Sequence, residues 1–304
     1  MLNKGLDSPC ESRANMITGS VFSSTDFTGK AAIGPRGANM TTILLMYILD
    51  GAVAGILAGL LGIGGGVIIV PMLVFCFVRQ GIPDALIMHM ALGTSLASIM
   101  FTAVASFRAH QKRGAVHWDV VRKIIIGIFT GTFLGSCVAA QLSTRFLKGF
   151  FVVFLYYVAV QMLTNRKPKP SRQIPGHAAM FGVGNVIGVV SSLVGIGGGA
   201  LSVPFMIWRN MSVHHAIGTS AAIGFPIAIA GTIGYIYNGF SVQNLPDFSI
   251  GYIYLPALFG IVVTSVLTAP LGVRLAHSLP VGRLKQIFAV LLLLVATRML
   301  IGIL

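Results

Sequence analysis

The sequence predicts an all-α polytopic membrane protein composed of two homologous repeats. Hydrophobic residues make up 55% of the 304 residues and charged residues only 9%, which leaves too little polar surface for a water-soluble chain of this length. From residue 41 onward, apolar stretches of about 20 residues, long enough to cross a bilayer core as helices, alternate with short polar breaks. These stretches lack the alternation of barrel strands, so helices are the structure that can satisfy their backbone in lipid.

An internal duplication is the second observation behind this prediction. Residues 60–73 read LLGIGGGVIIVPML, and residues 193–206 read LVGIGGGALSVPFM. A Gly-Thr-Ser triplet then follows each copy, at 93–95 and at 218–220. Because the same two words recur in the same order, we infer two homologous repeats.

The apolar runs, taken in chain order, predict ten helices, five in each repeat. In the first repeat (41–164) we expect them at about 42–61, 67–79, 87–107, 122–142 and 147–164. In the second repeat (178–304) we expect them at about 178–194, 199–208, 214–237, 250–273 and 285–303. The segments 67–79 and 199–208 are too short for an ordinary crossing and are expected to be half-length or strongly tilted. If they cross, each repeat has five spans and the repeats are inverted; otherwise each has four and the repeats are parallel.

Two polar segments flank or separate the repeats. Residues 1–40 are rich in Ser, Thr, Gly and Asn and are expected to form a disordered N-terminal tail. No apolar core follows the first positive charge closely enough for a secretory signal, and Met40 offers an alternative start. Residues 165–177 contain four Lys or Arg residues and three prolines, which predicts a stiff, basic, cytoplasmic linker.

Basic residues predict the orientation of the chain. Lys and Arg cluster near residue 111, in the linker and near residue 278, whereas the loop 237–250 has neither. The basic connections are therefore expected in the cytoplasm, and the loop 237–250 and the N-terminus outside. This pattern explains the excess of 21 Lys and Arg over 7 Asp and Glu without nucleic acid, and it predicts a multi-pass protein of the plasma membrane with the lipid bilayer as its partner.

The two glycine blocks are the first candidate binding site. Glycine permits backbone angles and close approaches that other residues do not, and interrupted helices at corresponding places in two repeats are typical of transporter sites. The helices that would begin at Val67 and Ala200 would direct their N-terminal N–H groups at an anion. The alternative is close helix packing through small residues. The block residues are Gly62, Gly64, Gly65, Gly66, Gly195, Gly197, Gly198 and Gly199.

Hydroxyl and imidazole side chains near the blocks are further candidates. Hydroxyl groups can donate to an oxyanion without carrying a charge that must be desolvated; the alternative is bonding to the helix carbonyl four residues earlier. His89 and His214 occupy the same repeat position and could attract an anion as cations; the alternative is an interfacial histidine bonded to a carbonyl. The hydroxyl candidates are Thr94, Ser95, Thr219 and Ser220.

Asp50 is the one carboxylate inside an apolar run. It could serve in proton coupling, or it could be a satisfied acid near a helix terminus or near Arg298. The three cysteines, Cys10, Cys76 and Cys137, share no metal-ligand spacing. Since HExxH, GxSxG and paired intramembrane acids are also missing from the sequence, we expect no metal, no cofactor and no enzymatic activity.

These motifs resemble those of the TauE/SafE sulfite-exporter family, also called the 4-toluene sulfonate uptake permease family. The resemblance rests on the duplicated G-I-G-G-G with a proline five residues further on, on the Gly-Thr-Ser triplets, and on the basic loop before a Gly-rich span. It implies a secondary transporter of a small sulfur oxyanion or organosulfonate, such as sulfite. A passive anion channel and a transporter of an unrelated small organic anion are the alternatives. Substrate identity, direction, coupling ion and oligomeric state do not follow from the motifs.

Overall fold

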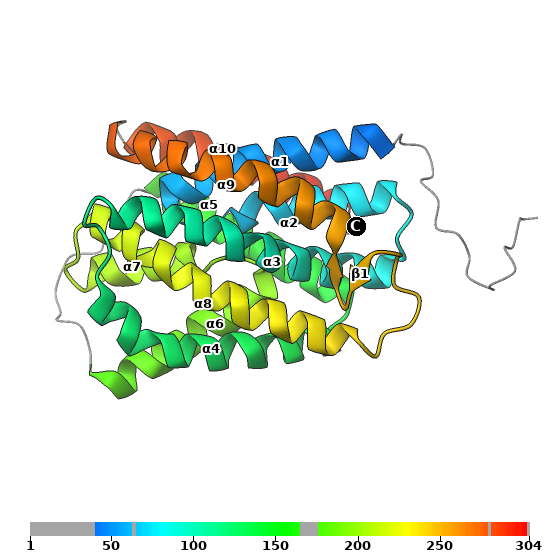
Figure 1. Ribbon diagram of the computed structural model, residues 1–304, viewed down its shortest axis with the longest axis horizontal. Coiled ribbons are helices and arrows are strands. Elements are labelled where there is room, and N and C mark those ends of the chain that lie inside the picture. The colour runs from blue at the N-terminus through cyan, green and yellow to red at the C-terminus, as the bar shows by residue number, and fades with distance from the viewer. Residues whose placement is uncertain (1–39, 63–64, 165–175, 279–280, 303–304) are drawn as a thin grey trace, which may run out of the picture. The chain divides into compact units, whose positions relative to one another are not determined.

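The structure is a computed structural model that describes residues 40–62, 65–164, 176–278 and 281–302. Within these residues it contains ten helices and one short hairpin (Figure 1). The elements are α1 (Met40–Leu61), α2 (Gly66–Arg79), α3 (Asp84–Gln111), α4 (Trp118–Gln141), α5 (Thr144–Thr164), α6 (His177–Val194), α7 (Gly199–Trp208), α8 (Val213–Gly239), β1 (Ser249–Ile250), β2 (Ile253–Tyr254), α9 (Leu255–Ser278) and α10 (Val281–Ile301). Nearly all of the predicted N-terminal tail and linker lies outside the described residues.

The predicted all-α membrane fold is confirmed. Seven described helices, α1, α3, α4, α5, α6, α8 and α9, are long and apolar enough to cross a membrane. The two segments predicted to be short are short, with 14 residues in α2 and 10 in α7. The ninth helix is displaced from its predicted range of about 250–273 to Leu255–Ser278. It starts later because β1 and β2 form a hairpin with Gly251 at a φ of 55°.

The packing of the helices repeats between the two halves. If α1–α5 are matched in order to α6–α10, the main contacts between the repeats have counterparts: α1 packs on α9 as α6 packs on α4, and α3 packs on α9 as α8 packs on α4. Within the repeats, α2 packs on α3 as α7 packs on α8. The matched helices α3 and α8 contact each other, as do α5 and α10. The two repeats are therefore related by a pseudo-two-fold operation.

Helices α1 and α9 run parallel to each other. The Thr264 hydroxyl donates to the Ile48 carbonyl at 2.9 Å, and four residues further on the Thr268 hydroxyl donates to the Ala52 carbonyl at 3.0 Å. Helices α4 and α6 are also parallel, because Gly127 lies beside Phe181 and, four residues further along both helices, Gly131 lies beside Asn185. Figure 1 shows α1 beside α9 and α4 beside α6.

Helices α3 and α8 run in opposite directions. Gly93 near the start of α3 lies against Tyr235 near the end of α8, whereas Gly224 of α8 lies against Ala103 further along α3. Helix α9 runs parallel to α3, because Thr102 of α3 bonds to Ser265 of α9, and Arg113 just after α3 bonds to Val273 further along α9. Helix α4 likewise runs parallel to α8, because Thr132 lies beside Gly231 and Ser136 lies beside Gly234. Combined with the α1–α9 and α4–α6 pairs, these directions make α1 and α6, α3 and α8, and α4 and α9 antiparallel. The repeats are inverted, as five spans per repeat would require.

Small residues allow the closest helix pairs. Gly51, Gly55 and Gly59 recur every fourth residue on α1, and a Cβ atom at each would collide with backbone of α9. On α4, glycines at 127, 131 and 135 meet the backbone of α6 in the same way. This is the small-xxx-small pattern of membrane helix packing, and the spacing of these glycines is visible in the sequence.

Candidate functional site

Both glycine blocks break their helices with the same backbone conformation. Gly62 and Gly195, which follow α1 and α6, have φ values of 66° and 70°. Gly65 and Gly198, which precede α2 and α7, have φ values of 76° and 74°. These left-handed angles explain why glycine stands at these positions. Gly64 lies outside the described residues.

The two blocks meet inside the helix bundle. A Cβ atom at Gly66 would collide with the carbonyl of Gly195 and would lie 3.0 Å from the Ile196 Cα atom. Gly197 lies against α8, where a Cβ atom at Gly224 would be 3.3 Å from its carbonyl oxygen. The described block glycines are all buried: Gly62, Gly65, Gly66, Gly195, Gly197, Gly198 and Gly199. Segments more than 100 residues apart in the sequence therefore form one buried region.

The serines of the Gly-Thr-Ser triplets each hold the glycine block of the other repeat. The Ser95 hydroxyl donates to the Gly195 carbonyl at 2.8 Å, and the Ser220 hydroxyl donates to the Gly62 carbonyl at 3.1 Å. The Ser220 oxygen also lies 2.8 Å from the hydroxyl of Ser202 in the first turn of α7. Each broken helix is thus fixed in place by the opposite repeat.

The threonines of the triplets make a second reciprocal pair of contacts. The Thr94 hydroxyl accepts the backbone N–H of Tyr254 at 3.0 Å, and the Thr219 hydroxyl accepts that of His117 at 3.0 Å. Tyr254 directly precedes α9 and His117 directly precedes α4, so these loops are equivalent in the two repeats. A hydroxyl that accepts one bond can still donate another. The sequence offered no signal for these two loop residues, since their partners lie more than 100 residues away.

His89 is buried, with 5% of its surface exposed. Its Nδ1 atom lies 3.1 Å from the Ala85 carbonyl, and its Nε2 atom lies 3.1 Å from the carbonyls of both Ala139 and Leu142 at the end of α4. Its ring stacks on Tyr252 with centroids 5.2 Å apart, and burial raises the pKa of that tyrosine, which keeps the phenol neutral. Because all three hydrogen-bond partners are carbonyl acceptors, either ring nitrogen can donate when it carries a proton.

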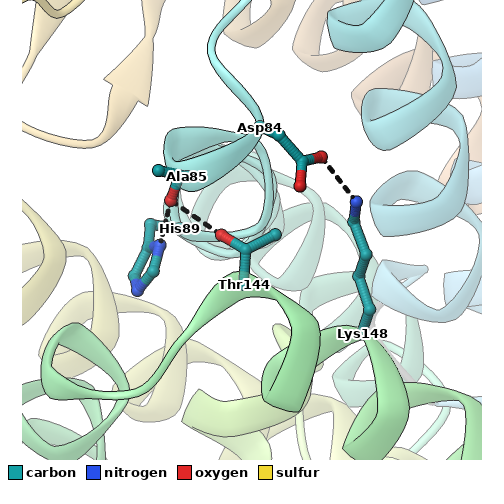
Figure 2. Close-up of polar contacts among 5 residues, drawn as sticks. All are labelled: Asp84, Ala85, His89, Thr144 and Lys148. Carbon is teal, nitrogen blue, oxygen red and sulfur yellow. Dashed lines mark hydrogen bonds and ion pairs between the residues drawn. The ribbon is translucent and has the colours of Figure 1, made fainter. Parts of the chain in front are cut away.

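The surroundings of His89 join the starts of α3 and α5. In Figure 2, His89 and the Thr144 hydroxyl converge on the Ala85 carbonyl, the latter at 2.7 Å. Beside them, Lys148 and Asp84 form an ion pair at 2.8 Å. His214, the counterpart of His89 in the second repeat, is exposed. The pseudo-symmetry of the repeats therefore does not extend to the two histidines.

Asp50 is neither an acid satisfied by a helix terminus nor one satisfied by Arg298. Only 3% of its surface is exposed, and neither carboxylate oxygen has a hydrogen-bond partner among the described residues. It stands in the middle of α1 rather than at a terminus. Arg298 is exposed, and the ion pair found in the described part of the chain joins Lys148 to Asp84. The interpretation of Asp50 as an acid satisfied by a helix terminus or by Arg298 is therefore wrong.

The chain is similar to proteins from several microbes. It is 38% identical to a probable membrane transporter protein of Haemophilus influenzae over 86% of this chain and 99% of that protein. It is 28% identical to one of Methanocaldococcus jannaschii over 80% of this chain and 90% of that protein, and 29% identical to the probable membrane transporter protein YdhB of Bacillus subtilis over 66% and 80%. No solved structure matches the chain.

The family comparison covers both repeats. The sequence model described as Sulfite exporter TauE/SafE matches residues 47–299, a range that includes both glycine blocks, both triplets and the inverted helix packing described above. The relatives from Haemophilus influenzae and Methanocaldococcus jannaschii are named probable membrane transporter proteins, and the similarity covers nearly their whole length. The chain is a multi-pass membrane transporter protein that belongs to the sulfite exporter TauE/SafE family.

Proposed function

We propose that this transporter is a secondary transporter of a small sulfur-containing anion, sulfite or an organosulfonate, in the plasma membrane. The observation that carries the proposal is the meeting of two glycine-broken helices inside an inverted-repeat bundle. Half-helix ends at the interface of such repeats are where transporters bind solutes. The family description adds sulfite as the first anion to test.

In this proposal the anion binds between the glycine blocks. The first N–H groups of α2 and α7, at Gly66 and Gly199, have no partner within their own helices and carry the positive end of the helix dipole. The hydroxyls of Thr94 and Thr219 add neutral donors. These donors carry no fixed opposite charge, so the anion can be released on the other side of the membrane.

Burial of the blocks bears on how the anion enters. The described block glycines and the four triplet hydroxyls are buried in this conformation, so binding requires a movement that opens them to one side. Inverted repeats can exchange their conformations, and this exchange opens the same site to either side in turn. The contacts that hold each block to the opposite repeat, from Ser95 and from Ser220, are the ones such an exchange would change.

The proposal is tested by transport in proteoliposomes. Purified protein is reconstituted, and uptake of labelled sulfite, sulfoacetate and taurine is measured with and without the same unlabelled anion inside. We expect saturable uptake of at least one of them, accelerated by anion on the opposite side, and none in protein-free vesicles. A conductance that is not accelerated in this way would indicate a passive channel, and uptake of none of the three would contradict the assignment to sulfur anions.

A further inference from the structure

Asp50 lies on the helix that leads into the first glycine block. Positions 47, 50 and 54 share one face of α1, and this face meets α2, because Tyr47 bonds to Gln80 directly after α2. One turn ahead of it, Ala54 touches the block: a Cβ atom at Gly65 would be 2.8 Å from the Ala54 carbonyl. With a rise of 1.5 Å per residue, Asp50 is therefore about 6 Å along the helix axis from the point where α2 begins.

The surroundings of Asp50 favour its neutral form. An ionised carboxylate buried among apolar groups requires a cation or several donors to offset its lost hydration, and the described residues supply neither to its two oxygens. A protonated carboxyl group has no net charge to offset. The titratable groups nearest to it on α1 and α2 are neutral side chains: Tyr47 lies one turn back on α1, and Cys76 of α2 contacts Met46 beside that tyrosine. Arg79 at the end of α2 lies over the ring of Phe75. On the other sides of Asp50, α9 places Ile261 and Thr264 beside Gly51. Helix α3 contacts α1 at Gly59, nine residues after Asp50, where the His110 ring bonds to the Gly59 carbonyl.

We propose that Asp50 is a proton-binding site that couples proton movement to anion movement through this transporter. The inference rests on the proposed function, because it assumes that an anion binds at the glycine blocks. In this scheme a proton from water on one side binds the carboxylate, travels with the anion, and is released to water on the other side. Proton and anion therefore move in the same direction.

Repulsion between like charges provides the coupling. An ionised Asp50 about 10 Å from a bound anion, at an effective dielectric constant of about 20, would lower the anion's affinity by about tenfold. By linkage, a bound anion raises the affinity of Asp50 for its proton by the same factor. The anion-loaded protein is therefore also the proton-loaded protein.

The test compares the wild type with Asp50→Asn, a substitution that keeps the shape and the neutral state but removes the titration. Labelled sulfoacetate, or labelled sulfite if only sulfite exchanges, is added outside the proteoliposomes, and two rates are measured. The first is exchange with unlabelled anion inside and no gradient; the second is net uptake into vesicles without internal anion, driven by a proton gradient and followed with a pH dye inside. We expect the gradient to raise wild-type accumulation about tenfold, with proton entry. We expect Asp50→Asn to keep exchange within about threefold of wild type and to lose the response to the gradient.

The matched control is Asp84→Asn, which removes an exposed acid from its ion pair with Lys148 and should leave coupling intact. Accumulation in Asp50→Asn that responds to the gradient as wild type does would overturn the proposal, as would wild-type uptake driven by sodium instead of protons. The two proposals fail differently: a wild type that exchanges neither anion overturns the proposed function and this inference with it, whereas exchange without any proton response overturns this inference alone.

A second measurement covers the case in which Asp50→Asn does not fold. Asp50→Glu keeps a titrating group and is expected to retain coupling. In addition, the infrared spectrum of the wild-type protein near neutral pH should contain the band of a protonated carboxylic acid, and addition of sulfoacetate or sulfite should increase that band. Loss of coupling in Asp50→Glu with normal exchange, or a wild-type spectrum without the band, would contradict the proposal.

Discussion

Four buried hydroxyls connect the repeats, and they have different tasks. Ser95 and Ser220 donate to carbonyls of the opposite glycine block, so their protons are used in holding the broken helices. Thr94 and Thr219 accept backbone N–H groups from the opposite repeat, which leaves their own protons to donate. The threonines are therefore the better candidates for direct contact with an anion.

We predict that Thr94→Val and Thr219→Val each weaken anion binding. Valine keeps the shape and removes the hydroxyl, and a lost hydrogen bond to a charged group costs about 1.5–3 kcal/mol, which raises the half-saturation concentration about tenfold or more. The measurement is concentration-dependent uptake of the best substrate. Thr164→Val is the control, because this exposed hydroxyl bonds within its own helix. Unchanged curves for both variants would exclude the threonines from the site and make His89 the next residue to test.

His89 provides a second prediction, on stability. In His89→Leu the carbonyls of Ala139 and Leu142 at the end of α4 lose their contact with the imidazole, and a buried polar group left without its partner costs about 1–3 kcal/mol. We expect the purified variant to unfold at a temperature several degrees lower than wild type. His177→Leu, at an exposed position at the start of α6, should unfold like wild type. Equal melting of the two variants would show that the contacts of His89 contribute little.

The broken helices are the elements on which the proposed function depends. Bulky substitutions inside the blocks test them poorly: Gly65 has a φ of 76°, and its Cβ atom would lie 2.8 Å from the Ala54 carbonyl. A leucine there is strained and displaces backbone, so loss of transport could not be separated from loss of folding. A substitution on a neighbouring helix that touches a block is more informative.

We therefore predict that Gly224→Ala on α8 lowers transport several-fold in a folded protein. Its methyl group would lie 3.3 Å from the Gly197 carbonyl and 3.8 Å from the Ala103 Cβ atom, so the second block must shift by a few tenths of an ångström while the helix gains propensity. Gly182→Ala on α6 meets nothing within 4 Å and serves as the control. Transport per folded molecule is compared by uptake and size-exclusion profile. Normal transport in Gly224→Ala would indicate that the block tolerates displacement.

For the whole molecule, the directions of the helices group the loops by membrane side. The loop after α3, the start of α8 and the end of α9 lie at one end, since Gly218 lies against Ala115 and Arg113 donates to the Val273 carbonyl. The β1–β2 hairpin lies at the other end, where Tyr254 contacts Thr94 near the start of α3. For the described connections near residues 111 and 278 and for the loop 237–250, this grouping matches the one predicted from the basic residues. The assignment of one end to the cytoplasm stays a prediction.

We predict that a cysteine introduced by Ser241→Cys is labelled from outside intact cells and that one introduced by Ser171→Cys is not. Ser241 is exposed beyond α8 at the hairpin end of the bundle, whereas Ser171 belongs to the basic linker outside the described residues. The experiment uses a membrane-impermeant thiol reagent after the native cysteines are replaced. Permeabilised cells should be labelled at both positions. The reverse pattern in intact cells would invert the topology.

Much of the fold could be predicted from local sequence. Apolar run length locates the helices, and the repeated GIGGG and Gly-Thr-Ser words show the duplication, because both signals reside in short stretches of chain. The same words were sufficient to suggest the family, which the match over residues 47–299 establishes. The start of α9 was predicted too early, because residues 249–254 are apolar enough for a helix while their hairpin depends on the φ of 55° at Gly251.

The contacts at the candidate site depend on tertiary structure. Ser95 reaches Gly195 and Ser220 reaches Gly62 because the repeats are inverted and their matched helices α3 and α8 lie side by side, a relation between residues more than 100 positions apart that no local pattern encodes. Two histidines at one repeat position likewise end in different surroundings, since the end of α4 covers His89 while His214 is exposed. The sequence by itself determined the helices, the repeats and the family; the packing of helices against one another decided which polar groups are paired and left Asp50 buried without a partner among the described residues.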